Sequence, residues 1–233
     1  MGQQIDIEVP DIGQVGGWLA RPEGEPTGAL VVIQEIFGVN AHMRAVVEGY
    51  ARDGFLALAP AFFDPVERNV ELAYDEEGFR RGREMIAATG MERAVAIVAA
   101  AADWLRTALR DGGDDGTGSQ RVGAVGFCWG GTVAYLANTR LGLPAVSYYG
   151  ARTVQFLDEP LRAPMMFHFG GNDSAITADD IAAHRTKHPD AATHVYPAAG
   201  HAFNRDVDPH AYEPESARLA RQRTMELFHS ALR

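Results

Sequence analysis

The chain has 233 residues, 46% of them hydrophobic and 22% charged, and its formal net charge is -10 at pH 7. This composition is typical of a globular protein with a substantial core, and it excludes an intrinsically disordered chain and a disulfide-dense scaffold. The acidic excess, without any run of Lys or Arg, argues against a nucleic-acid partner, because phosphate binding requires a clustered basic surface.

The beginning of the chain reads MGQQIDIEVPDIGQVGG and has no basic region followed by an apolar run. No later stretch reaches the ~18 apolar residues of a membrane span. The single cysteine, Cys128, has no second cysteine in the chain to pair with, which suits a reducing compartment. We therefore predict a cytoplasmic protein, a monomer or small homo-oligomer, that binds neither membranes nor nucleic acid.

In chain order, short apolar runs alternate with longer segments of helical pattern. The predicted strands are 5–9, 16–20, 28–34, 55–60, 121–127, 144–150, 163–170 and 192–197, and the first two form a hairpin. The predicted helices lie near 41–52, 70–88, 91–110, 130–140, 178–187 and 215–231. This alternation is typical of an α/β protein with a mostly parallel central sheet and helices on both faces.

The most linker-like segment is 111–120, which reads DGGDDGTGSQ. A strand follows it at once, and neither side of it contains a complete sheet. The segment is therefore interpreted as a surface loop between a helix and a strand rather than a domain boundary. We predict a single domain over residues 1–233.

The stretch GFCWGG, residues 126–131, lies directly after one predicted strand and before a predicted helix. In a nucleophile elbow the chain leaves a strand, makes a strained turn that exposes one side chain, and enters a helix. Gly126 and Gly130 supply the small residues that the close approach of the two backbones requires. The helix N-terminus favours the thiolate, which is the reactive form of Cys128. The alternative is an inert buried thiol, which is the usual state of a lone cysteine.

A thiol nucleophile needs a base, and the base needs an orienting acid. In sheets that carry this elbow, the acid and then the histidine follow later strands in that order. Asp173 follows the strand at 163–170, and His201 follows the strand at 192–197. Both positions are at carboxyl ends of strands, where such sheets hold ligand-facing residues. We therefore predict that Cys128, His201 and Asp173 form a triad.

Other histidines and acids compete for these roles. His210 is the main alternative to His201, because it also follows the last strand, but Gly200 directly before His201 permits the sharper turn. Five further histidines are interpreted as core residues of strands (His168, His194) or as solvated or packing residues on or just beyond helices (His184, His188, His229). Asp179 and Asp180 are typical of a first helical turn, and Asp158 of a surface loop. No zinc-binding or nucleotide-binding motif is present, so we predict no metal and no cofactor.

Four segments, QEIFGVN, GFCWGG, GGNDSAI and AAGHAFNRD, occur in the order and approximate spacing of the dienelactone hydrolase family of α/β-hydrolases. The chain strongly resembles this family over nearly its whole length. The resemblance implies the single-domain α/β-hydrolase fold, with Cys128 as nucleophile, His201 as base and Asp173 as its partner. It also implies that Glu35 contacts the resting thiol and is drawn away when substrate binds, so that the thiolate forms.

By the same resemblance, the backbone N–H groups of Ile36 and Trp129 form the oxyanion hole. The resemblance also assigns substrate contacts to Arg205, Tyr149 and Phe37, with the arginine holding a substrate carboxylate. One departure is Ala202, where dienelactone-active members carry a serine that helps to hold this carboxylate. The family's second carboxylate-binding arginine has no convincing match in 62–90, because the arginines there resemble one face of a charged helix (Arg80, Arg81, Arg83).

The predicted function is cysteine-dependent hydrolysis of a small ester or lactone through a thioester acyl-enzyme, with dienelactone (carboxymethylenebutenolide) as the candidate substrate. A general carboxylesterase acting on small neutral esters is the enzymatic alternative. A non-catalytic ligand-binding or thiol-sensing protein on the same fold is the alternative of another class, since fold alone does not determine function.

Overall fold

The computed structural model describes residues 2–111 and 121–232, so most of the predicted loop at 111–120 lies outside the described residues. Contacts between Cα atoms divide the described chain into two compact units. Of the described residues, the first unit contains 2–111, 121–124 and 232, and the second contains 125–231. The single domain over 1–233 stays a prediction.

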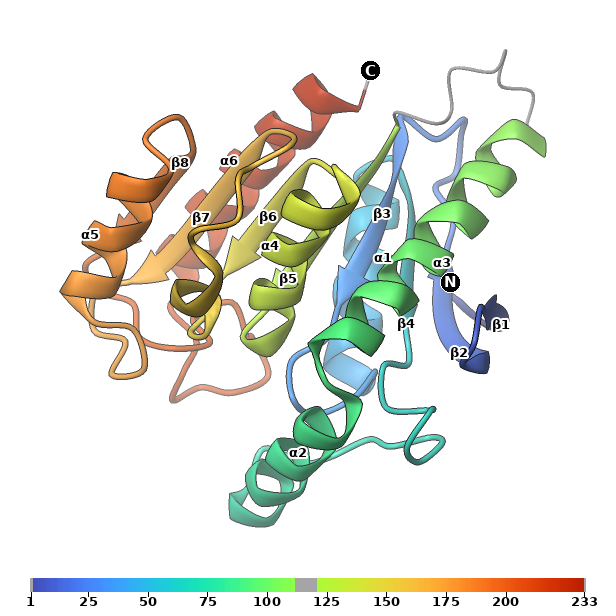
Figure 1. Ribbon diagram of the computed structural model, residues 1–233, viewed down its shortest axis with the longest axis horizontal. Coiled ribbons are helices and arrows are strands. Elements are labelled where there is room, and N and C mark those ends of the chain that lie inside the picture. Colours follow the sequence, from blue (N-terminus) through green and yellow to red (C-terminus); the bar gives the residue numbers. More distant parts are fainter. Residues whose placement is uncertain (1, 112–120, 233) are drawn as a thin grey trace. The chain divides into compact units, whose positions relative to one another are not determined.

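Eight strands form a mixed, mostly parallel sheet in the order β1-β2-β4-β3-β5-β6-β7-β8 (Figure 1). Their bounds are β1 Gln3–Val9, β2 Gly13–Ala20, β3 Gly28–Ile33, β4 Phe55–Pro60, β5 Val122–Phe127, β6 Ala145–Tyr148, β7 Met165–Gly170 and β8 Ala192–Tyr196. Each corresponds to a predicted strand, and the α/β fold with a mostly parallel sheet is confirmed.

The helices are α1 Ala41–Arg52, α2 Glu76–Thr89, α3 Met91–Asp111, α4 Trp129–Leu141, α5 Ala178–Lys187 and α6 Pro214–Ala231, with a short 3-10 helix, η2, at Thr153–Phe156. The predicted start of the second helix at residue 70 is wrong. Glu71 instead pairs with Gly38 in an isolated antiparallel bridge, and Asp75 begins the helix by accepting a hydrogen bond from Gly78 N at 2.7 Å. Four residues are too few to show a helical period, so η2 was not predicted.

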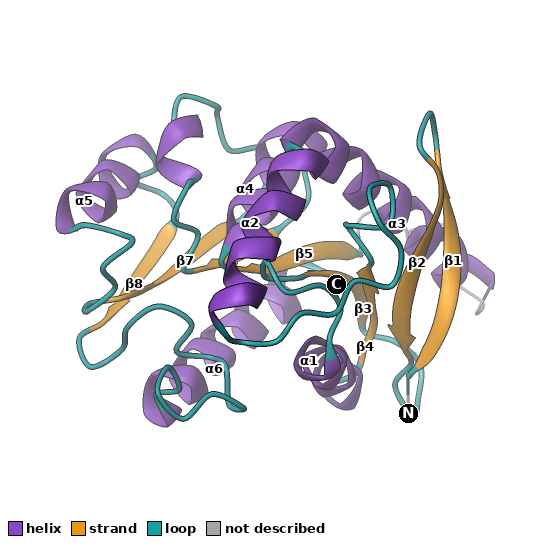
Figure 2. Ribbon diagram, turned by 90° about the horizontal axis from the view of Figure 1, so that it is seen from below, coloured by secondary structure: helices purple, strands orange, loops and turns teal. Residues whose placement is uncertain are grey.

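In the first unit, β1 and β2 form the predicted hairpin, β2 pairs antiparallel with β4, and β3 pairs parallel with β4. Helices α1 and α3 cover opposite faces of these strands (Figure 2). Every residue of β3 is therefore buried, as expected for a strand covered on both sides. No single helix among the described residues is long and apolar enough to cross a membrane; α2 and α3, bent by 80°, reach that length and composition only as a pair.

In the second unit, β6, β7 and β8 are parallel neighbours. Helices α4 and α5 lie on one face of these strands and α6 on the other (Figure 2). Because parallel strands end at the same edge of a sheet, the loops that follow β7 and β8 emerge side by side. These loops carry Asp173 and His201.

Candidate active site

Cys128 stands alone between the last residue of β5 and the first residue of α4, with a φ of 55° and a ψ of -118°. This left-handed conformation is strained for any residue with a side chain. The turn is so tight that a Cβ atom on Gly126 would lie 1.8 Å from the carbonyl oxygen of Gly130. The local geometry is therefore that of the predicted elbow, and the thiol is partly exposed.

Two backbone hydrogen bonds also hold the elbow in place. The backbone N–H of Cys128 donates to the carbonyl oxygen of Tyr148, the last residue of β6, at 3.0 Å. The carbonyl oxygen of Cys128 accepts a hydrogen bond from Gly131 N at 2.9 Å, inside α4. The strained residue is thus anchored both to the neighbouring strand and to its own helix.

The loops after β7 and β8 are tied together by their backbones. Asn172 N donates to Ala199 O, and Gly171 N donates to Tyr196 O, each at 2.8 Å. Gly170 permits this approach, because a Cβ atom there would lie 2.5 Å from the carbonyl oxygen of Gly200. The two loops are held in one arrangement, with the acid of one loop beside the histidine of the other.

The three residues of the predicted triad meet in the second unit. His201 Nδ1 lies 2.7 Å from Asp173 Oδ2, and the Asp173 side chain is fully buried. Asp173 Oδ1 accepts a second hydrogen bond from Ala175 N at 2.8 Å. The imidazole of His201 also hydrogen-bonds to the Cys128 side chain. The arrangement can remove a proton from the thiol and stabilise the imidazolium that forms.

The electrostatics of His201 reflect both partners. Burial by itself would lower its pKa, but hydrogen bonds to Asp173 and Cys128, together with the charges of both residues, raise the pKa to about 10. Each contact favours the protonated ring. These contacts therefore stabilise the imidazolium of His201 relative to that of a free histidine.

This pairing makes the pKa of His201 dependent on Cys128. In Cys128→Ala both contributions from the thiol are lost while burial and Asp173 remain, so the pKa of His201 should fall below about 10. An NMR titration of the imidazole carbon resonances measures the shift directly. The resonances of the exposed His210 serve as the internal control and should be the same in both proteins. An unchanged His201 curve would show that the two side chains are not paired.

The other histidines are accounted for by their surroundings. His210 and His229 are exposed, and His168 is fully buried within β7, as predicted; His194 is only half-buried on β8. His184 and His188 are buried, so they are packing residues and the solvated interpretation is wrong. His184 in α5 and His188 directly after this helix both lie against the ring of Phe167. Within residues 2–111 and 121–232, no three side chains of His, Cys, Asp or Glu are grouped to hold a metal ion.

Two predicted substrate-contact residues lie in the second unit. The ring of Tyr149 lies 5.1 Å from that of His201, and Tyr149 has a left-handed φ of 41°. Arg205 is only 3% exposed, and its Nη1 donates to Asp208 Oδ2 at 3.2 Å. A solvent-exposed arginine is hydrated by water and would not need a carboxylate partner, whereas a buried one does. Asp208 was not among the predicted site residues, because the turn that brings it to Arg205 leaves no periodic pattern in the sequence.

Three further predicted residues belong to the first unit. Glu35, Ile36 and Phe37 lie in the loop that follows β3 and are buried. The ring of Phe37 makes edge contacts with Tyr74 and Phe79, with centroids 4.7 Å and 5.0 Å apart. The predicted roles of these residues, and that of the Trp129 N–H at the start of α4, stay predictions.

The arginines of α2 behave as the sequence suggested. Arg80 pairs with Glu77 and Glu84 on its own helix, and Arg81 pairs with Glu67 and Glu84. All these groups are exposed or partly exposed, so the pairs form a solvated charged face. No substrate-binding arginine is assigned to α2.

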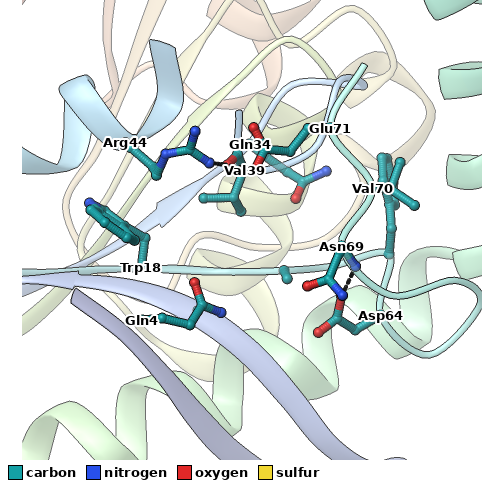
Figure 3. Close-up of a pocket in the computed structure, with 12 residues that line it drawn as sticks. Gln4, Trp18, Gln34, Val39, Arg44, Asp64, Asn69, Val70 and Glu71 are labelled. Atoms are coloured by element: carbon teal, nitrogen blue, oxygen red, sulfur yellow. Dashed lines mark hydrogen bonds and ion pairs between the residues drawn. The ribbon is translucent and has the colours of Figure 1, made fainter. Parts of the chain in front are cut away.

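The first unit also contains a small cavity of about 50 Å³ (Figure 3). Arg44, Glu71 and Gln34 lie on its wall, and Arg44 Nη1 pairs with Glu71 Oε1 at 2.6 Å. Gln34 Nε2 donates to the carbonyl oxygen of Glu35 at 3.3 Å. The volume suffices for a few water molecules. None of the predicted catalytic residues lines this cavity, so it is not assigned as the substrate site.

Several known proteins are similar to this chain in sequence and in fold. Residues 15–232 match the model of the Dienelactone hydrolase family. The chain is 31% identical over 230 residues to "Carboxymethylenebutenolidase" of Pseudomonas sp. (strain P51), covering 96% of this chain and 93% of that one. It is 30% identical over 231 residues to the enzyme of the same name from Pseudomonas putida, covering 96% and 94%. A solved structure named "Putative Dienelactone Hydrolase", from Klebsiella pneumoniae, superposes with a TM-score of 0.81 at 28% identity, covering 98% of each chain.

Proposed function

The chain belongs to the dienelactone hydrolase family and is a carboxymethylenebutenolidase-like hydrolase, and from this we propose that it hydrolyses a small ester or lactone through a thioester on Cys128. One observation supports the proposal most strongly: His201 hydrogen-bonds to both Asp173 and Cys128, and Cys128 occupies a strained elbow. The names of the relatives support carboxymethylenebutenolide as the substrate.

In the acylation step, the Cys128 thiolate attacks the carbonyl carbon and the π electrons of the carbonyl move to its oxygen. The backbone N–H of Trp129, at the start of α4, is proposed to stabilise this charge. Collapse of the tetrahedral intermediate breaks the bond to the ring oxygen, which leaves as an enolate. His201, which carries the proton taken from the Cys128 thiol and whose protonated form is stabilised by its neighbours, can donate this proton to the leaving group.

In the deacylation step, the charge of the thiolate has been consumed in the thioester. The contributions of Cys128 that raise the pKa of His201 are then lost, so the imidazole becomes a neutral base more readily. It takes a proton from water as the water oxygen attacks the thioester carbonyl. The thiolate leaves, the carboxylic acid is released, and the imidazolium–thiolate pair is restored.

This chemistry favours an activated substrate. An enolate is a stabilised leaving group, so the tetrahedral intermediate expels it in preference to the thiolate. An ordinary alkoxide is a poorer leaving group than a thiolate. We therefore expect lactones with enol leaving groups to react faster than simple alkyl esters.

The test is ring opening of cis- and trans-dienelactone by the purified protein, followed by ultraviolet absorbance, with phenyl acetate assayed in parallel. We expect turnover of dienelactone and, after rapid acid quenching, a mass increase on the peptide that contains Cys128. Hydrolysis without an adduct on Cys128 would overturn the covalent mechanism. Absence of hydrolysis of any ester would overturn the proposed function.

Arg205 provides a test of the substrate class. If its guanidinium holds a substrate carboxylate, Arg205→Ala should raise KM about tenfold or more for dienelactone and change KM for phenyl acetate far less, because a charge-assisted hydrogen bond contributes about 1.5–3 kcal/mol. Arg218→Ala, which removes an exposed arginine paired with Glu215, is the control. Equal changes in KM for both substrates would contradict the assignment.

A carboxylesterase acting on neutral esters is a second candidate, and one observation favours it. Arg205 is already paired with Asp208, so a substrate carboxylate must compete with the carboxylate of Asp208 for the guanidinium. Ala202 adds no hydroxyl group next to His201. Turnover of phenyl acetate without turnover of dienelactone would support this candidate and retain the proposed triad.

A further inference from the structure

A fully buried histidine outside the triad makes hydrogen bonds through both ring nitrogens. His168, in the middle of β7, is 0% exposed. Its Nδ1 lies 2.9 Å from the hydroxyl oxygen of Tyr196, and its Nε2 lies 3.1 Å from Thr224 Oγ1. The proposed hydrolytic mechanism does not use this residue.

These contacts are the middle of a longer chain of hydrogen bonds within the second unit. At one end, Arg223 Nη1 donates to the Tyr196 hydroxyl oxygen at 3.1 Å, and the guanidinium lies 5.5 Å from the centre of the Tyr196 ring. At the other end, Thr224 Oγ1 lies 2.7 Å from the hydroxyl oxygen of Tyr148. These hydrogen bonds therefore join α6 to the last residues of β6 and β8 through His168 of β7.

The donor and acceptor capacities of these groups are compatible with a chain that runs from Arg223 to Tyr148. A guanidinium only donates, so the Tyr196 oxygen accepts from Arg223, and in this direction the Tyr196 hydroxyl donates its own hydrogen to His168 Nδ1. A neutral imidazole that accepts at Nδ1 carries its hydrogen on Nε2 and donates it to Thr224. The Thr224 hydroxyl then donates to Tyr148. Burial first of all, together with nearby His194 and Arg223, lowers the pKa of His168, which keeps the ring neutral.

The Tyr148 end of this hydrogen-bond chain lies next to residues of the proposed triad. The carbonyl oxygen of Tyr148 accepts the backbone N–H of Cys128, and the carbonyl oxygen of His168 accepts that of Tyr149 at 2.8 Å. Tyr149 packs against the His201 ring and, like Cys128, has a left-handed φ. A strained backbone persists only where its surroundings hold it in place.

We propose that Arg223, Tyr196, His168, Thr224 and Tyr148 form a directed hydrogen-bond chain that holds the end of β6 in place and thereby positions Cys128 and His201. These are positioning residues, because they act through the backbone of β6 and not on the substrate. The inference rests on the proposed function for its catalytic consequence. The direction of the chain is independent of that function.

The direction is tested by NMR on the wild-type protein labelled with ¹⁵N-histidine. We expect His168 to be neutral at pH 7, with a protonated Nε2 and an unprotonated Nδ1. In Tyr196→Phe, which removes the donor to Nδ1, the His168 signals should show loss of this single tautomer. A protonated Nδ1 in the wild-type protein would overturn the proposed direction.

The positioning role is tested by Thr224→Val, which replaces the hydroxyl with a methyl group at nearly constant volume. We expect kcat to fall about tenfold, with KM within twofold of the wild-type value, in protein shown to be folded by circular dichroism. Thr224→Ser retains the hydroxyl and should restore kcat to within about twofold. Thr186→Val, at an exposed threonine of α5, is the matched control and should have no effect.

A purely structural role would lower the melting temperature of Thr224→Val but leave kcat of the folded protein unchanged, and that result would overturn the proposal. Should Thr224→Val not fold, Tyr196→Phe provides the same kinetic comparison. The rate of Cys128 alkylation by iodoacetamide is a readout that needs no substrate. We expect a severalfold change in Thr224→Val and none in Thr224→Ser, even if the wild-type protein hydrolyses no ester, so the two proposals can fail separately.

Discussion

Replacing Cys128 by alanine is expected to lower kcat for ester or lactone hydrolysis by a factor on the order of 10⁵, because removal of a catalytic nucleophile leaves only oxyanion stabilisation and substrate binding. The side chain lies on a strained turn, partly exposed and hydrogen-bonded to His201. Alanine can occupy the turn without adding volume, so the fold should be retained. Steady-state kinetics and the melting temperature together measure the effect.

Chemical modification provides an independent control for this prediction. Cys128 is the single cysteine of the chain, so iodoacetamide treatment of the wild-type protein should cause the same loss of activity. A low concentration of a competing ester should slow the modification. Retention of more than about a tenth of the wild-type kcat in Cys128→Ala would contradict a nucleophilic role.

Replacing Asp173 by asparagine is expected to lower kcat by about 10³–10⁴-fold, or roughly 4–5 kcal/mol, with little change in KM. The two oxygens of Asp173 accept from His201 Nδ1 and from Ala175 N. An amide has only one acceptor oxygen, so its NH2 group must face one of these two donors. If the NH2 group faces His201, Nδ1 becomes the acceptor and Nε2 carries the proton. The ring can then no longer accept a proton from Cys128.

Asp158→Asn is the matched control for this substitution. Asp158 is an exposed acid of the second unit that pairs with Lys187 at 2.6 Å, and such a surface pair contributes little. Its replacement should leave kcat unchanged. In Asp173→Asn the pKa of His201 should also fall below about 10, because Asp173 raises it. A loss of less than about tenfold in kcat would show that Asp173 does not orient the base.

Much of the fold could be predicted because its determinants are local in sequence. Strand β3 is a continuous apolar run because both of its faces are covered, and α3 repeats buried residues such as Val98, Ala102 and Leu105 at helical spacing. The extended conformation of the residues before α2 could not be predicted in the same way. It includes a bridge between Glu71 and Gly38, residues that are distant in sequence, whereas the start of α2 itself has a local signal in Asp75.

The candidate site likewise has features that are local in sequence and features that depend on distant residues. The sequence by itself determined the elbow, because the spacing of Gly126 and Gly130 around Cys128 is a local requirement of two closely approaching backbones. Chain order also identified Asp173 and His201, since both directly follow strands that end at one edge of the sheet.

Only the tertiary structure decided how these groups are held. The hydrogen bond between His201 and Asp173 depends on backbone contacts between two loops, and the burial of His184 depends on Phe167 in another element. The hydrogen-bond chain behind the proposed triad links residues 27 to 76 positions apart. Such contacts leave no local pattern, because they arise when distant segments pack and each buried polar group must find a partner.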